Sequence, residues 1–235
     1  MSDTLLYITE VAPYAPGRPA GVHRVLPQAA TALAQLADMA GLAFRHADDV
    51  RQLGPRTIAR TRVLALFTIG ETRWSQVQRD AILDRVRAGE MSVLGIHSVT
   101  DSSHEWPEFG DLIGARFDGH PWTQELTINV VDSDHPATRG LPARWHLPDE
   151  IYLFRDLRED ARVLLALDPA ELDMSLPGAR IPEIGFPLAW CLHEGAGRVF
   201  YTALGHFPEA FENIDYLGHL SGALQWLMGD AEPAS

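Results

Sequence analysis

The stretch SVLGIHSVTD, residues 92–101, reads as a short apolar strand that ends abruptly in small polar residues. Such a strand is typical of an open α/β sheet. Val93, Leu94 and Ile96 form the apolar part, and His97 follows directly. In an open α/β sheet, ligands bind at the carboxyl ends of such strands, where side chains leaving the sheet meet helix N-termini. His97 is therefore the first candidate for a functional residue.

Strands and helices alternate on the amino-terminal side of this stretch. Helices are predicted from apolar residues at helical spacing, and strands from short apolar runs between turn residues. In chain order these segments are strand 5–9, helix 22–40, strands 43–47 and 63–67, helix 74–87 and strand 92–96. This alternation predicts an α/β fold with a doubly wound, mostly parallel sheet. A Pro- and Gly-rich loop, residues 12–21, is expected at the same sheet edge as His97.

The second half of the chain has a different rhythm, because strands follow one another with few helices between them. The segments are a short helix at 106–114, strands at 125–131, 151–154, 162–167, 188–192 and 198–202, and a closing helix at 214–228. We expect these strands to add antiparallel partners to the parallel sheet or to form a small second sheet. Residues 1–229 are expected to form one domain, followed by a flexible tail at 230–235.

The composition excludes several functions. A formal net charge of −13 would repel nucleic-acid phosphates, and no apolar run is long enough to cross a bilayer. All 19 basic residues are arginine, which excludes a Schiff-base lysine. The single cysteine, Cys191, excludes an internal disulfide and a multi-cysteine zinc site. With an acidic N-terminus unlike a secretory signal, these features favour a cytoplasmic protein.

Four separated stretches together resemble the ThuA-like (trehalose utilisation) family of the class I glutamine amidotransferase-like superfamily. In sequence order they are Gly95-Ile96-His97-Ser98 with Asp101, GDLIGARFDGHP at 110–121, Asp149-Glu150 with Tyr152, and WCLHEGAGRVFYTALGH at 190–206. The resemblance covers nearly the whole chain. It implies a flavodoxin-like, doubly wound sheet with an inserted antiparallel portion, and a link to disaccharide catabolism through 3-keto sugars.

Glutaminase activity is not expected. Amidotransferases need a cysteine nucleophile on a sharp strand-to-helix turn, and His97 occupies the corresponding position here. An imidazole cannot form the thioester, and Cys191 lies in an apolar run that indicates burial.

The predicted catalytic residues are His97, Glu150, His206 and Asp101. His97 is interpreted as a general acid/base or a ligand, and alternatively as a ring that only holds the turn. His206 follows the strand at 198–202 and could reach the same sheet edge. Asp101 either orients His97 or caps the turn. Glu150 lies beside an aromatic residue, a pairing that suits a sugar, and alternatively is a solvated strand start.

Substrate-binding roles are predicted for His120, Ser98, Tyr152, Trp106 and His23, although Ser98 could instead cap the turn after the strand. A divalent metal such as zinc is a further hypothesis. His97 and His206 would supply two ligands and Glu150 the third, with His23 and His120 as alternatives. No H-E-x-x-H spacing supports the metal site.

The sequence therefore predicts a protein that acts on or binds a sugar or sugar derivative, through acid/base chemistry such as hydrolysis or elimination of a 3-keto glycoside. A non-catalytic sugar-sensing or partner-binding module and a structural subunit remain alternatives. The expected partner is a small molecule, with no nucleic acid and no membrane, and a homodimer is possible on this sequence.

Overall fold

The computed structural model describes residues 3–21 and 23–230; the predicted helix start at Val22 and residues 231–235 of the predicted tail lie outside them. The elements are β1 (Thr4–Ile8), α1 (Leu26–Met39), β2 (Ala43–Ala47), α2 (Pro55–Arg60), β3 (Thr61–Leu66), α3 (Gln76–Arg87), β4 (Ser92–Ile96), α4 (Pro107–Ile113), β5 (Arg116–Phe117), β6 (Trp122–Val130), β7 (Arg144–Ile151), β8 (Phe154–Arg155), β9 (Arg162–Leu167), β10 (Pro187–Glu194), β11 (Gly197–Thr202) and α5 (Ile214–Met228). Short 3₁₀ turns lie between them, and one of these, His97–Asp101, follows β4 directly.

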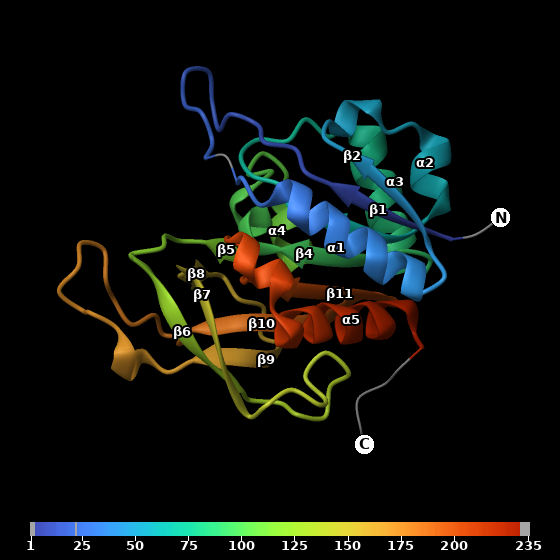
Figure 1. The fold of residues 1–235 in the computed structure, drawn as a ribbon. Coiled ribbons are helices and arrows are strands. Elements are labelled where there is room, and N and C mark those ends of the chain that lie inside the picture. The colour runs from blue at the N-terminus through green and yellow to red at the C-terminus, as the bar shows by residue number, and fades with distance from the viewer. Residues whose placement is uncertain (1–2, 22, 231–235) are drawn as a thin grey trace.

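A nine-stranded sheet in the order β2-β1-β3-β4-β11-β10-β9-β6-β7 forms the centre of the molecule (Figure 1). The strands from β2 to β11 pair in parallel, and the strands from β11 to β7 pair antiparallel. The prediction of a doubly wound, mostly parallel sheet with added antiparallel strands is confirmed. Strand β11 joins the two parts, because it pairs with β4 on one side and with β10 on the other.

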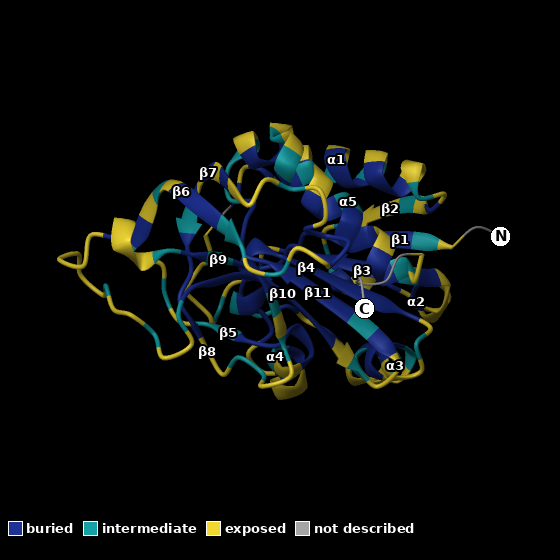
Figure 2. Ribbon diagram, turned by 90° about the horizontal axis from the view of Figure 1, so that it is seen from below, coloured by how far each residue is buried: buried dark blue, intermediate teal, exposed yellow. Residues whose placement is uncertain are grey.

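Helices cover both faces of the sheet, with α1 and α5 on one face and α3 and α4 on the other (Figure 2). Two apolar clusters fill the space between the helices and the sheet, one built on Leu33 and Leu224 and the other on Ile82 and Ile113. Pro27 lies in the first turn of α1, as predicted, where its missing N–H costs no hydrogen bond. None of the helices in the described ranges is long and apolar enough to cross a membrane.

Strand β7 corrects the sequence prediction. A strand was expected at residues 151–154, but the strand runs over Arg144–Ile151 and therefore ends, rather than begins, at the Asp149-Glu150 pair. Sequence analysis missed this strand because Pro148 lies within it, and proline, which cannot donate a hydrogen bond to a neighbouring strand, argues against a strand. It is tolerated because β7 is the edge strand of the sheet. Buried Trp145, Leu147 and Asp149 alternate with more exposed residues, and this two-residue period is the strand signal that the sequence does contain.

Candidate functional site

His97 is the first residue after β4 and stands on a sharp turn. Its φ angle is +47°, a left-handed conformation that non-glycine residues rarely adopt and that clusters at functional sites. The Tyr201 hydroxyl donates to the His97 carbonyl over 2.8 Å, and Nδ1 of the His97 ring donates to the Ala203 carbonyl over 2.7 Å. Because that carbonyl can only accept, Nε2 of the neutral His97 ring is left as an acceptor.

Asp149, near the end of β7, ties this strand to the loop after β11. Its buried carboxylate accepts hydrogen bonds from the backbone N–H groups of Gly205 (2.7 Å), His206 (3.2 Å) and Glu150 (2.8 Å). Gly205 has a φ angle of +121°, which favours glycine. Burial raises the pKa of Asp149, although His97 and these N–H groups oppose the rise. The carboxylate thus holds the backbone of His206 close to that of Glu150.

Four predicted site residues come together at this point. Oε2 of Glu150 lies 3.3 Å from Nδ1 of His206 and 3.5 Å from Nε2 of His97. Nε2 of His97 also lies 3.1 Å from Nδ1 of His206 and 2.8 Å from the hydroxyl of Tyr152, which can donate to it. A carboxylate, two imidazoles and a phenol from three separate segments therefore share one small volume.

The pKa values of Glu150 and His206 are shifted more by their charged neighbours than by burial. Burial alone would raise the pKa of Glu150, but the adjacent His206 and His97 rings hold that pKa well below its usual range. Burial alone would lower the pKa of His206, but the Glu150 carboxylate raises it. The contact therefore favours the ionised form of Glu150 and the protonated form of His206 relative to the isolated groups.

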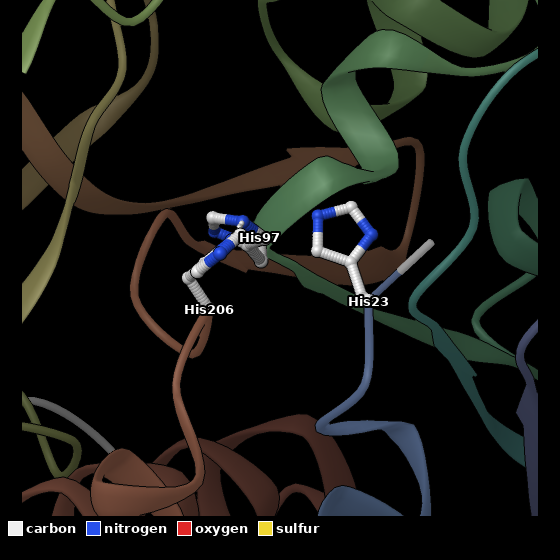
Figure 3. A group of neighbouring side chains, drawn as sticks. All are labelled: His23, His97 and His206. Carbon is white, nitrogen blue, oxygen red and sulfur yellow. Dashed lines mark hydrogen bonds between the residues drawn. The ribbon is translucent and has the colours of Figure 1, made fainter. Parts of the chain in front are cut away.

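Two more predicted residues approach the same group from other loops. Nδ1 of His120 lies 3.6 Å from Oε1 of Glu150, the carboxylate oxygen that His206 does not approach. His23, in the loop before α1, packs edge-on against His97 and His206, with ring centroids 5.0 and 5.3 Å away (Figure 3). Burial, followed by the two neighbouring histidines, lowers the pKa of His23 to about 3, so the ring is neutral.

This group opens onto a cavity of about 780 Å³. His97 itself does not line the cavity: it is completely buried and contacts His206 and Tyr152, which do line it. The side chains that line the cavity come from six parts of the chain and are mostly polar or aromatic. They include Tyr14, Arg18, His23, Glu71, Asp101, His104, Glu105, Phe117, Asp118, His120, Glu150, Tyr152 and His206.

Three predicted site residues have other contacts. Asp101 lines the cavity but does not orient His97; it accepts a 2.5 Å hydrogen bond from Tyr14 and lies 3.2 Å from His104. The Ser98 hydroxyl is buried and donates to the Thr68 carbonyl over 3.0 Å, so it does not reach the cavity. Trp106 is likewise outside the cavity, because it is buried against Trp74 and Phe109.

Sequence analysis gave little weight to Asp149, although this buried side chain supports both Glu150 and His206. Adjacent residues of a strand point to opposite faces, so only one carboxylate of the Asp149-Glu150 pair can reach the cavity. That reasoning would have separated their roles once the strand was known. Tyr14 was also missed as a cavity residue, since a Pro-rich loop gives no periodic signal.

Cys191 cannot replace the missing nucleophile. Burial raises the pKa of its thiol to about 12, and the residue lies within β10, away from the His97 turn. The fold is that of the glutamine amidotransferases, and His97 stands on the sharp turn that follows β4. A glutamine amidotransferase of Thermotoga maritima has this fold, with a TM-score of 0.57 and 11% identity over 97% of this chain and 99% of that one.

The chain belongs to the ThuA family, described as trehalose utilisation, whose model matches residues 17–227. Similar structures include a ThuA-like protein of Bacteroides uniformis, with a TM-score of 0.76 and 21% identity over 96% of this chain and 91% of that one. A ThuA-like protein of Parabacteroides merdae has a TM-score of 0.74 and 18% identity, covering 100% of this chain and 93% of that one. A search of curated proteins returned no match.

Proposed function

We propose that the protein binds a sugar or sugar derivative in the cavity and catalyses acid/base chemistry on it, with hydrolysis or elimination of a 3-keto glycoside as the reaction. The observation that carries this proposal is Glu150 lying between two imidazoles that both line the cavity, His206 at one carboxylate oxygen and His120 at the other. A structural subunit would have no reason to gather titratable groups at an open cavity.

The lining of the cavity supports a neutral sugar rather than a sugar phosphate. Its charged side chains are five carboxylates and one arginine: Glu71, Asp101, Glu105, Asp118, Glu150 and Arg18. Carboxylates accept hydrogen bonds from sugar hydroxyls but repel a phosphate. The rings of Phe117 and Tyr152 offer apolar faces for the C–H groups of a pyranose. The family description, trehalose utilisation, points to a disaccharide.

The chemistry requires one base and one acid. A carbonyl at C3 of the sugar acidifies the hydrogen on C2, and a base removes that proton while the electron pair forms a C1=C2 double bond. The C1–O bond breaks, and the departing oxygen takes a proton from the acid; addition of water to the double bond would complete hydrolysis. His206, whose pKa is raised by Glu150, suits the acid, and His120 suits the base. His97 positions His206 and Tyr152 from behind.

The test is turnover of 3-keto-trehalose, with unmodified trehalose as the comparison, measured by chromatography of the released sugars. Glu150→Gln, His206→Asn and His120→Asn should each lower kcat/KM by about 100-fold or more, the usual effect of losing a proton-transfer group. His146→Gln is the matched control, because His146 is exposed, lies on β7 like Glu150 and is outside the cavity.

Two outcomes would reject the catalytic proposal. Tight binding of the sugar without turnover by the unmodified protein would identify a sensing module. Full activity in both Glu150→Gln and His206→Asn would show that any turnover takes place without this group.

A further inference from the structure

Three histidines from distant parts of the chain face one another (Figure 3), and two of them, His23 and His206, line the cavity. His23 precedes α1, His97 follows β4 and His206 follows β11, and each offers a ring nitrogen within 4.8 Å of the others. Two of the rings are buried and the third is half-buried, so bulk water has limited access to the nitrogens. The proposed acid/base chemistry needs only one acid and one base, so it does not explain why three histidines cluster here.

The spacing of the innermost atoms matches a metal site. Nε2 of His97, Nδ1 of His206 and Oε2 of Glu150 are separated by 3.1, 3.3 and 3.5 Å, a nearly equilateral triangle. In tetrahedral zinc sites with bonds of about 2.0–2.1 Å, two ligand atoms lie about 3.3 Å apart. All three atoms could therefore bind one ion with little movement.

The lone pairs at these atoms point to a cation between them. Nδ1–H of His97 is bound to the Ala203 carbonyl, which leaves Nε2 as an acceptor; the Tyr152 hydroxyl 2.8 Å away can donate to it, and a metal ion would take the place of that hydrogen bond. The ionised carboxylate of Glu150 likewise has no hydrogen to donate. Two acceptors 3.5 Å apart repel unless a proton or a metal ion lies between them. A ligand histidine whose second nitrogen donates to a backbone carbonyl is also the usual arrangement in metal sites.

His23 is suited to complete the site. Its side chain is 8% exposed, and its ring nitrogens make no hydrogen bond to the residues that the structure describes. Because the ring lines the cavity and its nitrogens have no hydrogen-bond partner among the described residues, they are available to bind an ion.

We propose that His23, His97, His206 and Glu150 bind one divalent transition-metal ion, and that zinc is the ion these ligands favour. Imidazole nitrogens suit zinc and its neighbours rather than Mg²⁺ or Ca²⁺, which prefer oxygen ligands. The Asp149 carboxylate holds the backbone on either side of the ion through the N–H groups of Glu150 and His206.

With an ion bound, His206 is a ligand, and the ion takes the place of its acidic proton by polarising a sugar carbonyl or hydroxyl. This inference deepens the proposed function. It does not depend on it, since metal binding can be measured without any sugar. Loss of 3-keto-glycoside turnover and loss of metal binding are therefore separate results.

The experiment uses the full chain, stripped of metal with a chelator and then dialysed. Zinc is titrated in competition with a chromophoric chelator, and cobalt is added as a spectroscopic probe, because tetrahedral Co²⁺ absorbs strongly in the visible range. We expect one ion per chain and a tetrahedral cobalt spectrum. His23→Gln, His206→Gln and Glu150→Gln should each weaken zinc binding by more than the roughly 10–100-fold that follows loss of a supporting partner.

His104→Gln is the matched control, because His104 also lines the cavity but is outside the cluster of three. It should bind zinc as the unmodified protein does, and circular dichroism checks that every variant is folded. Failure of the unmodified protein to bind either ion at micromolar concentration overturns the proposal and leaves a proton between His97 and Glu150. Undiminished zinc binding by folded His23→Gln and His206→Gln, or equal loss in His104→Gln, overturns it as well.

Discussion

The histidines at the sheet edge differ in their neighbours from His219 of α5 and from His135, which packs near it. His206 lies beside the Glu150 carboxylate at an open cavity. His135 and His219 are completely enclosed, and the backbone of Ala137 supplies the hydrogen bonds to both rings. Burial lowers the pKa of each of these two to about 4, whereas Glu150 raises the pKa of His206.

The pKa values of His135 and His219 show that burial alone makes a histidine a neutral packing residue. A functional histidine needs a second, independently placed group that restores charge or supplies a ligand set. Here that group is Glu150, which is placed by Asp149 and by the end of an edge strand. Stability measurements on variants test three places: the Asp149 carboxylate that supports the site, the enclosed pair of histidines, and the turn that carries His97.

The largest effect is expected from Asp149→Leu. Leucine leaves the buried N–H groups of Gly205, His206 and Glu150 without an acceptor, so the free energy of unfolding should fall by about 3–5 kcal/mol. Asp149→Asn keeps one carbonyl oxygen and should lose less. Urea unfolding at pH 7.5 measures both.

The control for this series is Asp134→Asn, an exposed carboxylate in the loop after β6, which should change stability by less than about 0.5 kcal/mol. Equal losses for Asp149→Leu and Asp134→Asn would show that the Asp149 carboxylate does not hold the His206 loop.

The second effect concerns acid stability and the enclosed pair. The pKa of His219 is about 4 in the folded protein, against an ordinary value of 6.5, because burial disfavours its charged form. Between these values the unfolded chain binds the proton and the folded protein does not, so stability is lost as the pH falls below 6.5. Relative to pH 7.5, His219 should account for about 2 kcal/mol of lost stability at pH 5.

His219→Leu removes this contribution. The difference in unfolding free energy between pH 7.5 and pH 5.0 should therefore shrink by about 2 kcal/mol in the variant, even though the variant is less stable overall because the Ala137 carbonyl loses its donor. His146→Leu, at an exposed position, should leave the difference unchanged. An unaltered pH dependence in His219→Leu would refute the assignment.

Much of the fold was predictable, because alternating strands and helices leave a periodic pattern in the sequence. The parallel half and the position of His97 at its edge followed from runs such as Val93 to Ile96. Strand β7 was misplaced because Pro148 interrupts it, and β5 and β8 are two residues long, too short for any period. Local patterns could not reveal these elements, since tertiary pairing alone defines them.

The candidate site was predictable in its residues but not in its geometry. His97, His206 and Glu150 were chosen because each stood near a strand end, and the structure brings them within 3.5 Å. Ser98 was predicted to bind substrate, but its hydroxyl points inward to the Thr68 carbonyl. Sequence could not show this, because a side chain in a tight turn has no fixed face. Which of two adjacent carboxylates faces the cavity depends on long-range register, which one sequence does not contain.

The smallest effect tests the backbone strain at the His97 turn by comparing glycine with alanine. Both replacements delete the ring, but alanine must hold a φ angle of +47°, which costs about 1–2 kcal/mol in the left-handed region. His97→Gly should therefore be more stable than His97→Ala by about 1 kcal/mol. In the regular helix α5 the order should reverse, with His219→Ala more stable than His219→Gly by a similar amount. Urea unfolding of the four variants measures both differences, and the same order at both positions would show that the His97 turn is unstrained.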